Sequence, residues 1–188
     1  MRLTQTQINT IKSETAAAWA RLIQALEVSQ REIEHLSYSW RQLFVDRTPD
    51  LNWVKALTEQ PDEAVVLEAF VSRFARLQDQ LGARVIPRWL TVLAEEPGSH
   101  LENLNRAEKL GVLKSAEDWL TIRQVRNQLV HEYMQRPEDL VQALQNARTA
   151  TGLFIDTYNR IRAYTIKAFP EKQTELPTSI VVRDASPD

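Results

Sequence analysis

The sequence predicts an all-α protein, an up-and-down bundle of four to five main helices that begins with a long N-terminal helix. Three observations support this fold class. Apolar residues recur at spacings of three and four. Only 4 glycines and 8 prolines interrupt the 188 residues. Long stretches rich in Ala, Leu, Gln, Glu and Arg, which favour helix, run without alternating β-branched residues. A chain of this length is expected to bury a core of its own.

Residues 1–60 are expected to form a helical extension that packs on the bundle. No glycine or proline occurs from Thr4 to Phe44, which predicts one long helix, or two with a break near Ser29. A turn around Pro49 then precedes a short helix over 51–57. The apolar stripe of the long helix consists of Ile8, Ile11, Trp19, Leu22, Ile23, Leu26, Ile33, Leu36 and Trp40.

The main helical domain is predicted over residues 61–169. Pro61 and the two acids after it open a second long helix, because proline suits the first helical position and acids suit the first turn. Gly82 and Pro87 predict a kink in this helix, or a break followed by a separate helix over 88–93.

A loop at Glu96-Pro97-Gly98-Ser99 separates the first half of this domain from the second. Gly111 ends the helix that follows the loop, and Ser115 with Asp118 resembles a capping box at the start of the next one. The three helices after the loop are predicted over 100–110, 115–134 and 137–169. The tail, 170–188, has no helical stripe and is expected to be flexible.

Composition excludes several kinds of chemistry. A chain without cysteine has no disulfide scaffold, no thiolate metal site and no cysteine nucleophile. Neither a P-loop nor a dinucleotide-binding glycine motif occurs. The net charge of -2 argues against coating nucleic acid by bulk electrostatics, although it permits a local basic site. No export signal and no membrane-length apolar run are present, so we expect a cytoplasmic protein with no membrane partner.

One segment, 119–133, carries residues suited to chemistry. At about 100° per residue, Arg123, Arg126, Asn127 and His131 form a polar strip beside the apolar face of the predicted helix. Arginine binds phosphate with two parallel hydrogen bonds, and histidine moves protons near neutral pH. These residue types suit cleavage of a phosphodiester without a metal, with His131 transferring protons and Arg126 stabilising charge on the phosphate.

Two points qualify this interpretation. One histidine does not easily act as both acid and base, whereas a two-fold dimer would bring two copies of the strip into one cleft. The other two histidines, His35 and His100, lie in unrelated parts of the sequence. The strip also has a purely structural interpretation, in which Arg126 pairs with a carboxylate while Asn127 and His131 cap nearby backbone.

Residues 126–133 read R-N-Q-L-V-H-E-Y and match the pattern R-x4-H-x-Y. This pattern resembles the signature of the HEPN superfamily, most closely the HepT-like toxins of HEPN–MNT toxin–antitoxin pairs. The segments Arg106–Gly111 and Ser115–Trp119 resemble the residues that precede the motif in those families. The resemblance covers about 62–165 and makes 61–169 a HEPN-like domain; residues 1–60 exceed what a minimal HEPN domain needs.

The resemblance implies a metal-independent endoribonuclease that acts on RNA as a homodimer. Arg126 and His131 would be catalytic, with Asn127 and Arg123 in support, and no metal or cofactor is expected. Tyr133 matches the tyrosine that the MNT-type nucleotidyltransferase antitoxin modifies with AMP. An alternative is a non-catalytic HEPN module that binds a nucleotide or substrate for a nucleotidyltransferase. A third possibility is a helical interaction protein in which the motif is structural.

Other side chains have competing interpretations. The five tryptophans suit either base stacking or packing, and packing is favoured for Trp19 and Trp40 because they lie on the apolar stripe. Glu95 and Glu96 have no ligand partners at metal-binding spacing, so no metal site is predicted. Four arginines have two interpretations, as a basic rim that binds RNA or as a charged face exposed to solvent. They are Arg73, Arg76, Arg84 and Arg88.

Overall fold

The computed structural model describes residues 4–131 and 136–181. Within these ranges every regular element is helical and no strand occurs, which confirms the all-α prediction. A 3-10 turn follows α2, a π-helical turn joins α3 to α4, and a second 3-10 stretch follows α7. The α-helices are α1 (Gln5–Phe44), α2 (Leu51–Ala56), α3 (Pro61–Gln80), α4 (Ile86–Val92), α5 (His100–Lys109), α6 (Ala116–His131) and α7 (Pro137–Ala168).

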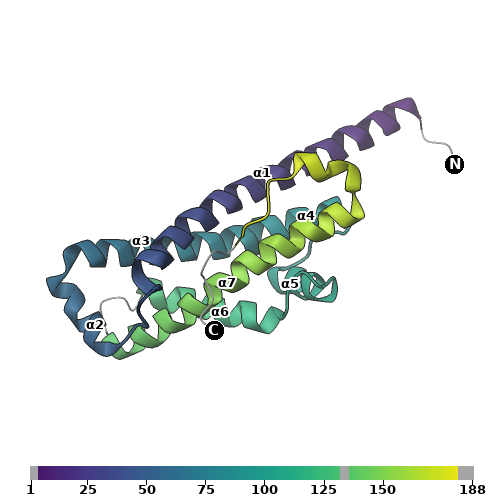
Figure 1. Cartoon of the computed structure of the whole chain (residues 1–188). Coiled ribbons are helices and arrows are strands. Elements are labelled where there is room, and N and C mark those ends of the chain that lie inside the picture. The colour runs from purple at the N-terminus through teal and green to yellow at the C-terminus, as the bar shows by residue number, and fades with distance from the viewer. Residues whose placement is uncertain (1–3, 132–135, 182–188) are drawn as a thin grey trace.

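The long N-terminal helix α1 is continuous. Thr4 caps it through a reciprocal capping box with Gln7. Ser29 does not break it, because its hydroxyl donates to the Ala25 carbonyl one turn earlier and stays within the helix. The first turns of α1 project beyond the rest of the bundle (Figure 1), and Ile11 there is 49% exposed although it belongs to the predicted apolar stripe.

The other helices fold back along α1 (Figure 1). Helices α3 and α4 pack on α1, α7 lies beside α1 and α3, and α6 packs between α7 and α3. One hydrophobic cluster runs through all of them, from Trp19 on α1 to Ile161 on α7. All five tryptophans are buried, which confirms packing as the role of Trp19 and Trp40. No helix among the described residues is long and apolar enough to cross a membrane.

A π-helical turn, Leu81–Val85, replaces the predicted kink. The Ile86 amide donates to the Leu81 carbonyl five residues back, instead of to the carbonyl four residues back. This turn of the helix therefore contains one extra residue. Pro87 explains the extra residue, because proline offers no amide hydrogen and its ring crowds the carbonyl four residues earlier. The chain therefore passes from α3 into α4 without a break.

The start of α6 is fixed by two side chains. The Ser115 hydroxyl accepts from the Asp118 amide at 3.0 Å, as the predicted cap requires. The Glu108 carboxylate on α5 accepts from the Ala116 amide at 2.8 Å. Since acceptors at a helix N-terminus satisfy amides that have no partner within the helix, both side chains set where α6 begins and how it meets α5.

Residues 170–181, expected to be flexible, pack on the bundle instead. Pro170–Glu175 forms a 3-10 turn, and residues 176–181, which we call the C-terminal strap, lie against α1 and α7. The Asn159 side chain exchanges two hydrogen bonds of 2.9 Å with the Ile180 backbone, and the Tyr158 hydroxyl donates to the Thr178 carbonyl at 3.0 Å. A helical-stripe pattern does not reveal such side-chain-to-backbone bonds. Residues 182–188 lie outside the described part of the chain.

Candidate functional site

Three residues of the polar strip, Arg123, Arg126 and Asn127, lie at the surface of α6. Its apolar neighbours Ile122, Val125 and Leu129 are buried. Arg123 and Asn127 are exposed and Arg126 is half-buried. His131 is the last residue of α6, but its side chain lies outside what the structure describes, and Tyr133 falls in the undescribed segment 132–135. The helix therefore presents three of the predicted site residues, Arg123, Arg126 and Asn127, on its outer side.

Arg126 forms contacts in two directions. One terminal nitrogen, Nη2, lies 3.0 Å from Oδ2 of Asp79 on α3, and the other, Nη1, donates to Oδ1 of Asn127 at 3.0 Å. Its Nε is buried and has no partner among the described residues. Asn127 thus supports the guanidinium of Arg126, while Asp79 supplies a counter-charge that the sequence did not identify.

The Asp79–Arg126 ion pair corresponds to the structural interpretation of Arg126, yet it lies close to solvent. The side chains of Arg126 and Asp79 are 31% and 57% exposed. Ion pairs at such exposure contribute between about 0 and 1 kcal/mol to stability. Loss of this ion pair would therefore cost the fold little stability.

A groove of about 410 Å³ lies between α3 and α6, with Arg126 at its edge. Its lining combines apolar side chains with charged groups of both signs. The groove therefore offers a ligand both apolar surface and charged groups. It is lined by Glu68, Val71, Ser72, Ala75, Arg76, Asp79, Arg126 and Leu129.

His100 on α5 lies beside Arg123, although the two residues are in unrelated parts of the sequence. It lines a second pocket, of about 200 Å³, together with Gln78, Asp79, Ala83 and Arg123. Its Nε2 is buried and has no partner among the described residues. Residues 100 and 123 lie on different helices, and no spacing rule connects them.

Burial and a nearby positive charge favour the neutral form of the His100 imidazole. Burial lowers its pKa from the ordinary 6.5, the positive charge of Arg123 lowers it further, and Asp79 opposes both effects. A neutral imidazole near pH 7 has one nitrogen that donates and one that accepts. His100 can therefore bind a ligand oxygen or take up a proton.

Asp79 belongs to both pockets and separates them. The orientation of the adjacent Gln78 amide is assigned from its hydrogen-bond partners, and in this orientation its nitrogen donates to Asp79 Oδ1 at 3.1 Å. The Gln78 oxygen accepts from Nε1 of the buried Trp119 at 3.2 Å. The carboxylate of Asp79 is thus held from the core side by Gln78 and from the surface side by Arg126.

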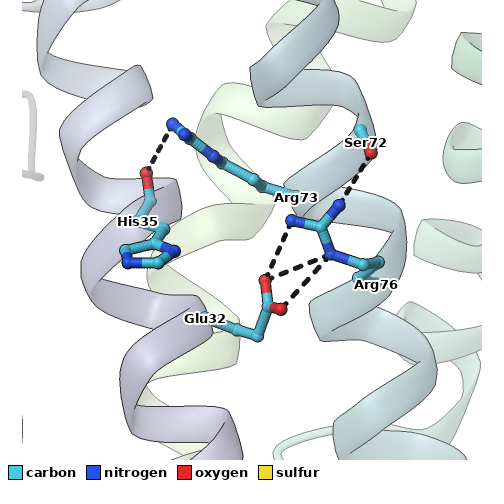
Figure 2. A network of polar contacts seen from close by, with 5 residues as sticks. All are labelled: Glu32, His35, Ser72, Arg73 and Arg76. Atoms are coloured by element: carbon cyan, nitrogen blue, oxygen red, sulfur yellow. Dashed lines mark hydrogen bonds and ion pairs between the residues drawn. The ribbon is translucent and has the colours of Figure 1, made fainter.

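Three of the four arginines considered as a basic rim bind other parts of the protein. Figure 2 shows Arg73 donating to the His35 carbonyl of α1, and Arg76 bonding to Glu32 and Ser72. Arg73 also bonds to the Ser39 hydroxyl, and Arg88 donates to the Arg21 carbonyl. Three of the four arginines thus hold α3 and α4 against α1, and only Arg76 also lines the groove beside Arg126.

Within residues 4–131 and 136–181, no three His, Asp or Glu side chains cluster as a metal site would require. Comparison of the chain with protein families, with curated proteins and with solved structures finds no match.

Proposed function

We propose that the protein is a metal-independent endoribonuclease that acts as a homodimer, with Arg126 and His131 as catalytic residues. The observation that carries this proposal is the placement of Arg126, which lies at the edge of the α3–α6 groove and is held by an exposed carboxylate. The likeness of residues 126–133 to the HEPN signature supplies the reaction class. Asn127 supports the proposal because it already orients the Arg126 guanidinium.

The chemistry is a transesterification. The ribose 2′-oxygen attacks the phosphorus as its proton passes to a neutral histidine, and the bond from phosphorus to the 5′-oxygen breaks. An imidazolium gives a proton to the departing 5′-oxygen, so that the products are a 2′,3′-cyclic phosphate and a 5′-hydroxyl. Arg126 stabilises the added negative charge on the phosphate oxygens through two parallel hydrogen bonds.

A homodimer supplies the second proton-transfer group. Each chain contributes one polar strip, and a two-fold axis beside α6 would place His131 of each copy in one cleft. Light scattering coupled to gel filtration tests the dimer directly. A monomer at all concentrations that support cleavage contradicts this arrangement.

The activity is tested with single-stranded RNA in excess EDTA. We expect Arg126→Gln and His131→Asn each to lower kcat/KM by about 100-fold or more, because both remove interactions of the transition state. Two matched controls, Arg31→Gln and His35→Gln, alter exposed side chains on α1 and are expected to cleave normally. Cyclic-phosphate ends on the products identify the reaction class.

Other outcomes separate the alternatives. RNA or nucleotide binding that Arg126→Gln abolishes, without any cleavage by the unaltered protein, indicates a binding module that serves a nucleotidyltransferase. No binding, together with a lower melting temperature of Arg126→Gln, indicates a structural motif. Intact-mass analysis after co-expression with an MNT-type nucleotidyltransferase tests whether Tyr133 accepts AMP.

A further inference from the structure

We infer, given the proposed ribonuclease activity, that His100 and Arg123 form a second subsite, which holds the RNA phosphate next to the one that is cleaved. Both side chains line the pocket of about 200 Å³ between α3, α5 and α6. Neither residue is needed for the transesterification itself. The role of the subsite is to position the RNA strand relative to the phosphate that is cleaved.

Geometry places this subsite directly beside the groove at Arg126. Asp79 lines both pockets, so the two pockets adjoin at this residue. Arg123 and Arg126 are three residues apart on α6, which makes them neighbours on the helix surface with a rise of about 4.5 Å between them. An RNA strand has one phosphate per nucleotide, so a strand crossing α6 brings successive phosphates to the two arginines.

The small pocket contains one guanidinium, that of Arg123, and one carboxylate, that of Asp79. No carboxylate among the described residues lies within ion-pair distance of Arg123. Asp79, which also lines the pocket, pairs with Arg126 in the structure rather than with Arg123. Arg123 therefore offers a guanidinium whose hydrogen-bonding fork matches the oxygens of a phosphate.

His100 supplies the second contact. Its Nε2 is buried without a partner among the described residues, and a buried polar atom without a hydrogen bond is costly. A phosphate oxygen beside Arg123 would accept from this nitrogen and remove that cost. The bound anion would also offset the effect of Arg123 on the imidazole, so the pKa of His100 rises when the subsite is filled.

The backbone around the pocket is shaped for this position of His100. Gly82 lies in the π-helical turn, and a Cβ there would approach Cε1 of His100 to 3.0 Å. A side chain at this position would therefore require His100 or Trp119 to shift by a few tenths of an ångström. Single π-turns within helices occur often at functional sites, and this one also contributes Ala83 to the pocket wall.

Binding of a short single-stranded RNA with methylated 2′-hydroxyls, which cannot be cut, tests the subsite by fluorescence anisotropy in EDTA. We expect His100→Gln and Arg123→Gln each to raise Kd by about 3–10-fold, and Arg123→Gln to lower the salt dependence by roughly one phosphate contact. With cleavable RNA, KM rises more than kcat falls. Arg31→Gln and His35→Gln serve as controls for charge and for loss of a histidine.

Proton NMR of the unaltered protein gives a readout independent of any variant. The titration midpoint of the His100 imidazole is expected to move upward when the methylated RNA is bound. An unchanged midpoint, or unchanged Kd and salt dependence in both variants, overturns the subsite while leaving the ribonuclease proposal intact. A loss of kcat with unchanged KM in His100→Gln also overturns it, because His100 would then act in the chemistry. If the unaltered protein neither binds nor cleaves RNA, both proposals fail.

Discussion

Asp79 on α3 and Arg126 on α6 join the two halves of the bundle through a contact of 3.0 Å between Oδ2 and Nη2. The residues are 47 positions apart in sequence. The same carboxylate lines the pocket that contains His100 and Arg123. Asp79 therefore supplies the counter-charge of Arg126 in the α3–α6 groove and also forms part of the wall of the His100 pocket. Replacing Asp79 is expected to affect both pockets.

Replacing the carboxylate in Asp79→Asn is expected to strengthen RNA binding. The variant frees Arg126 and removes a negative charge, so Kd falls by up to about five-fold, the equivalent of roughly 1 kcal/mol. The free energy of unfolding changes by less than about 1 kcal/mol, because the pair is exposed. Asp156→Asn, which makes the same change on α7 beside Lys114, is the matched control. Weaker RNA binding by Asp79→Asn would contradict a role for Arg126 in holding phosphate.

Two glycine-to-alanine variants are expected to change the free energy of unfolding in opposite directions. Gly82→Ala places a methyl group 3.0 Å from both His100 and Trp119 and lowers the free energy of unfolding by about 1–3 kcal/mol. Gly152→Ala, on α7, meets nothing within 4 Å and raises it by about 0.4–1 kcal/mol, since alanine favours helix. Urea unfolding measures both changes, and tryptophan fluorescence reports the disturbance at Trp119. Equal stability of the two variants would show that the π-turn has room to adjust.

The neutral imidazole of His100 makes stability depend on pH. Burial and Arg123 lower its pKa in the folded protein, so below about pH 6.5 the unfolded chain binds a proton that the native protein does not. Stability therefore falls as pH drops through 6.5 and levels off below the folded pKa. His100→Gln is expected to remove this part of the dependence, whereas His35→Gln retains it. Thermal melting from about pH 8 to about pH 5 gives the comparison; parallel curves for wild type and His100→Gln would contradict the assignment.

The C-terminal strap is expected to stabilise the bundle through Asn159. Asn159→Ala removes both hydrogen bonds to the Ile180 backbone, at a cost of about 1–3 kcal/mol in the free energy of unfolding. Limited proteolysis should then cut the strap sooner. Asn105→Ala, at an exposed position on α5, is the control. Unchanged proteolysis of Asn159→Ala would mean that the apolar contacts of Leu176 hold the strap without it.

Much of the fold follows from local sequence signals. The uninterrupted stripe from Trp19 to Trp40 predicted the long helix, and Ser115 predicted the start of α6, since each depends on residues close in sequence. The π-turn at Leu81–Val85 could not be predicted in detail, because glycine and proline there are also compatible with a kink or a break. The packing of the strap on the bundle was not predicted. Asn159 and Tyr158 bind backbone carbonyls of the strap, and such bonds leave no pattern in the strap's own sequence.

The candidate site likewise combines residues that local sequence patterns predict with residues that they do not predict. The strip of Arg123, Arg126 and Asn127 follows from the helical period of α6 alone. Asp79 and His100 come from α3 and α5, and the packing of three helices brings them to the strip. Sequence spacing predicts neighbours within a helix, whereas partners across helices depend on how side chains such as Trp119 and Gly82 fit together.

The strap also has a consequence for how the protein folds during synthesis. The Gln30 side chain on α1 donates to the Thr178 hydroxyl of the strap, across 148 residues of chain. At roughly 5–20 residues per second, a ribosome needs about 7–30 s to proceed from one to the other. The apolar side of α1 is synthesised before α3, α7 and the strap. It therefore stays uncovered until these segments have been synthesised and can pack against it. A nascent chain arrested before residue 176 is therefore expected to present this side of α1 to chaperones longer than the finished protein ever does.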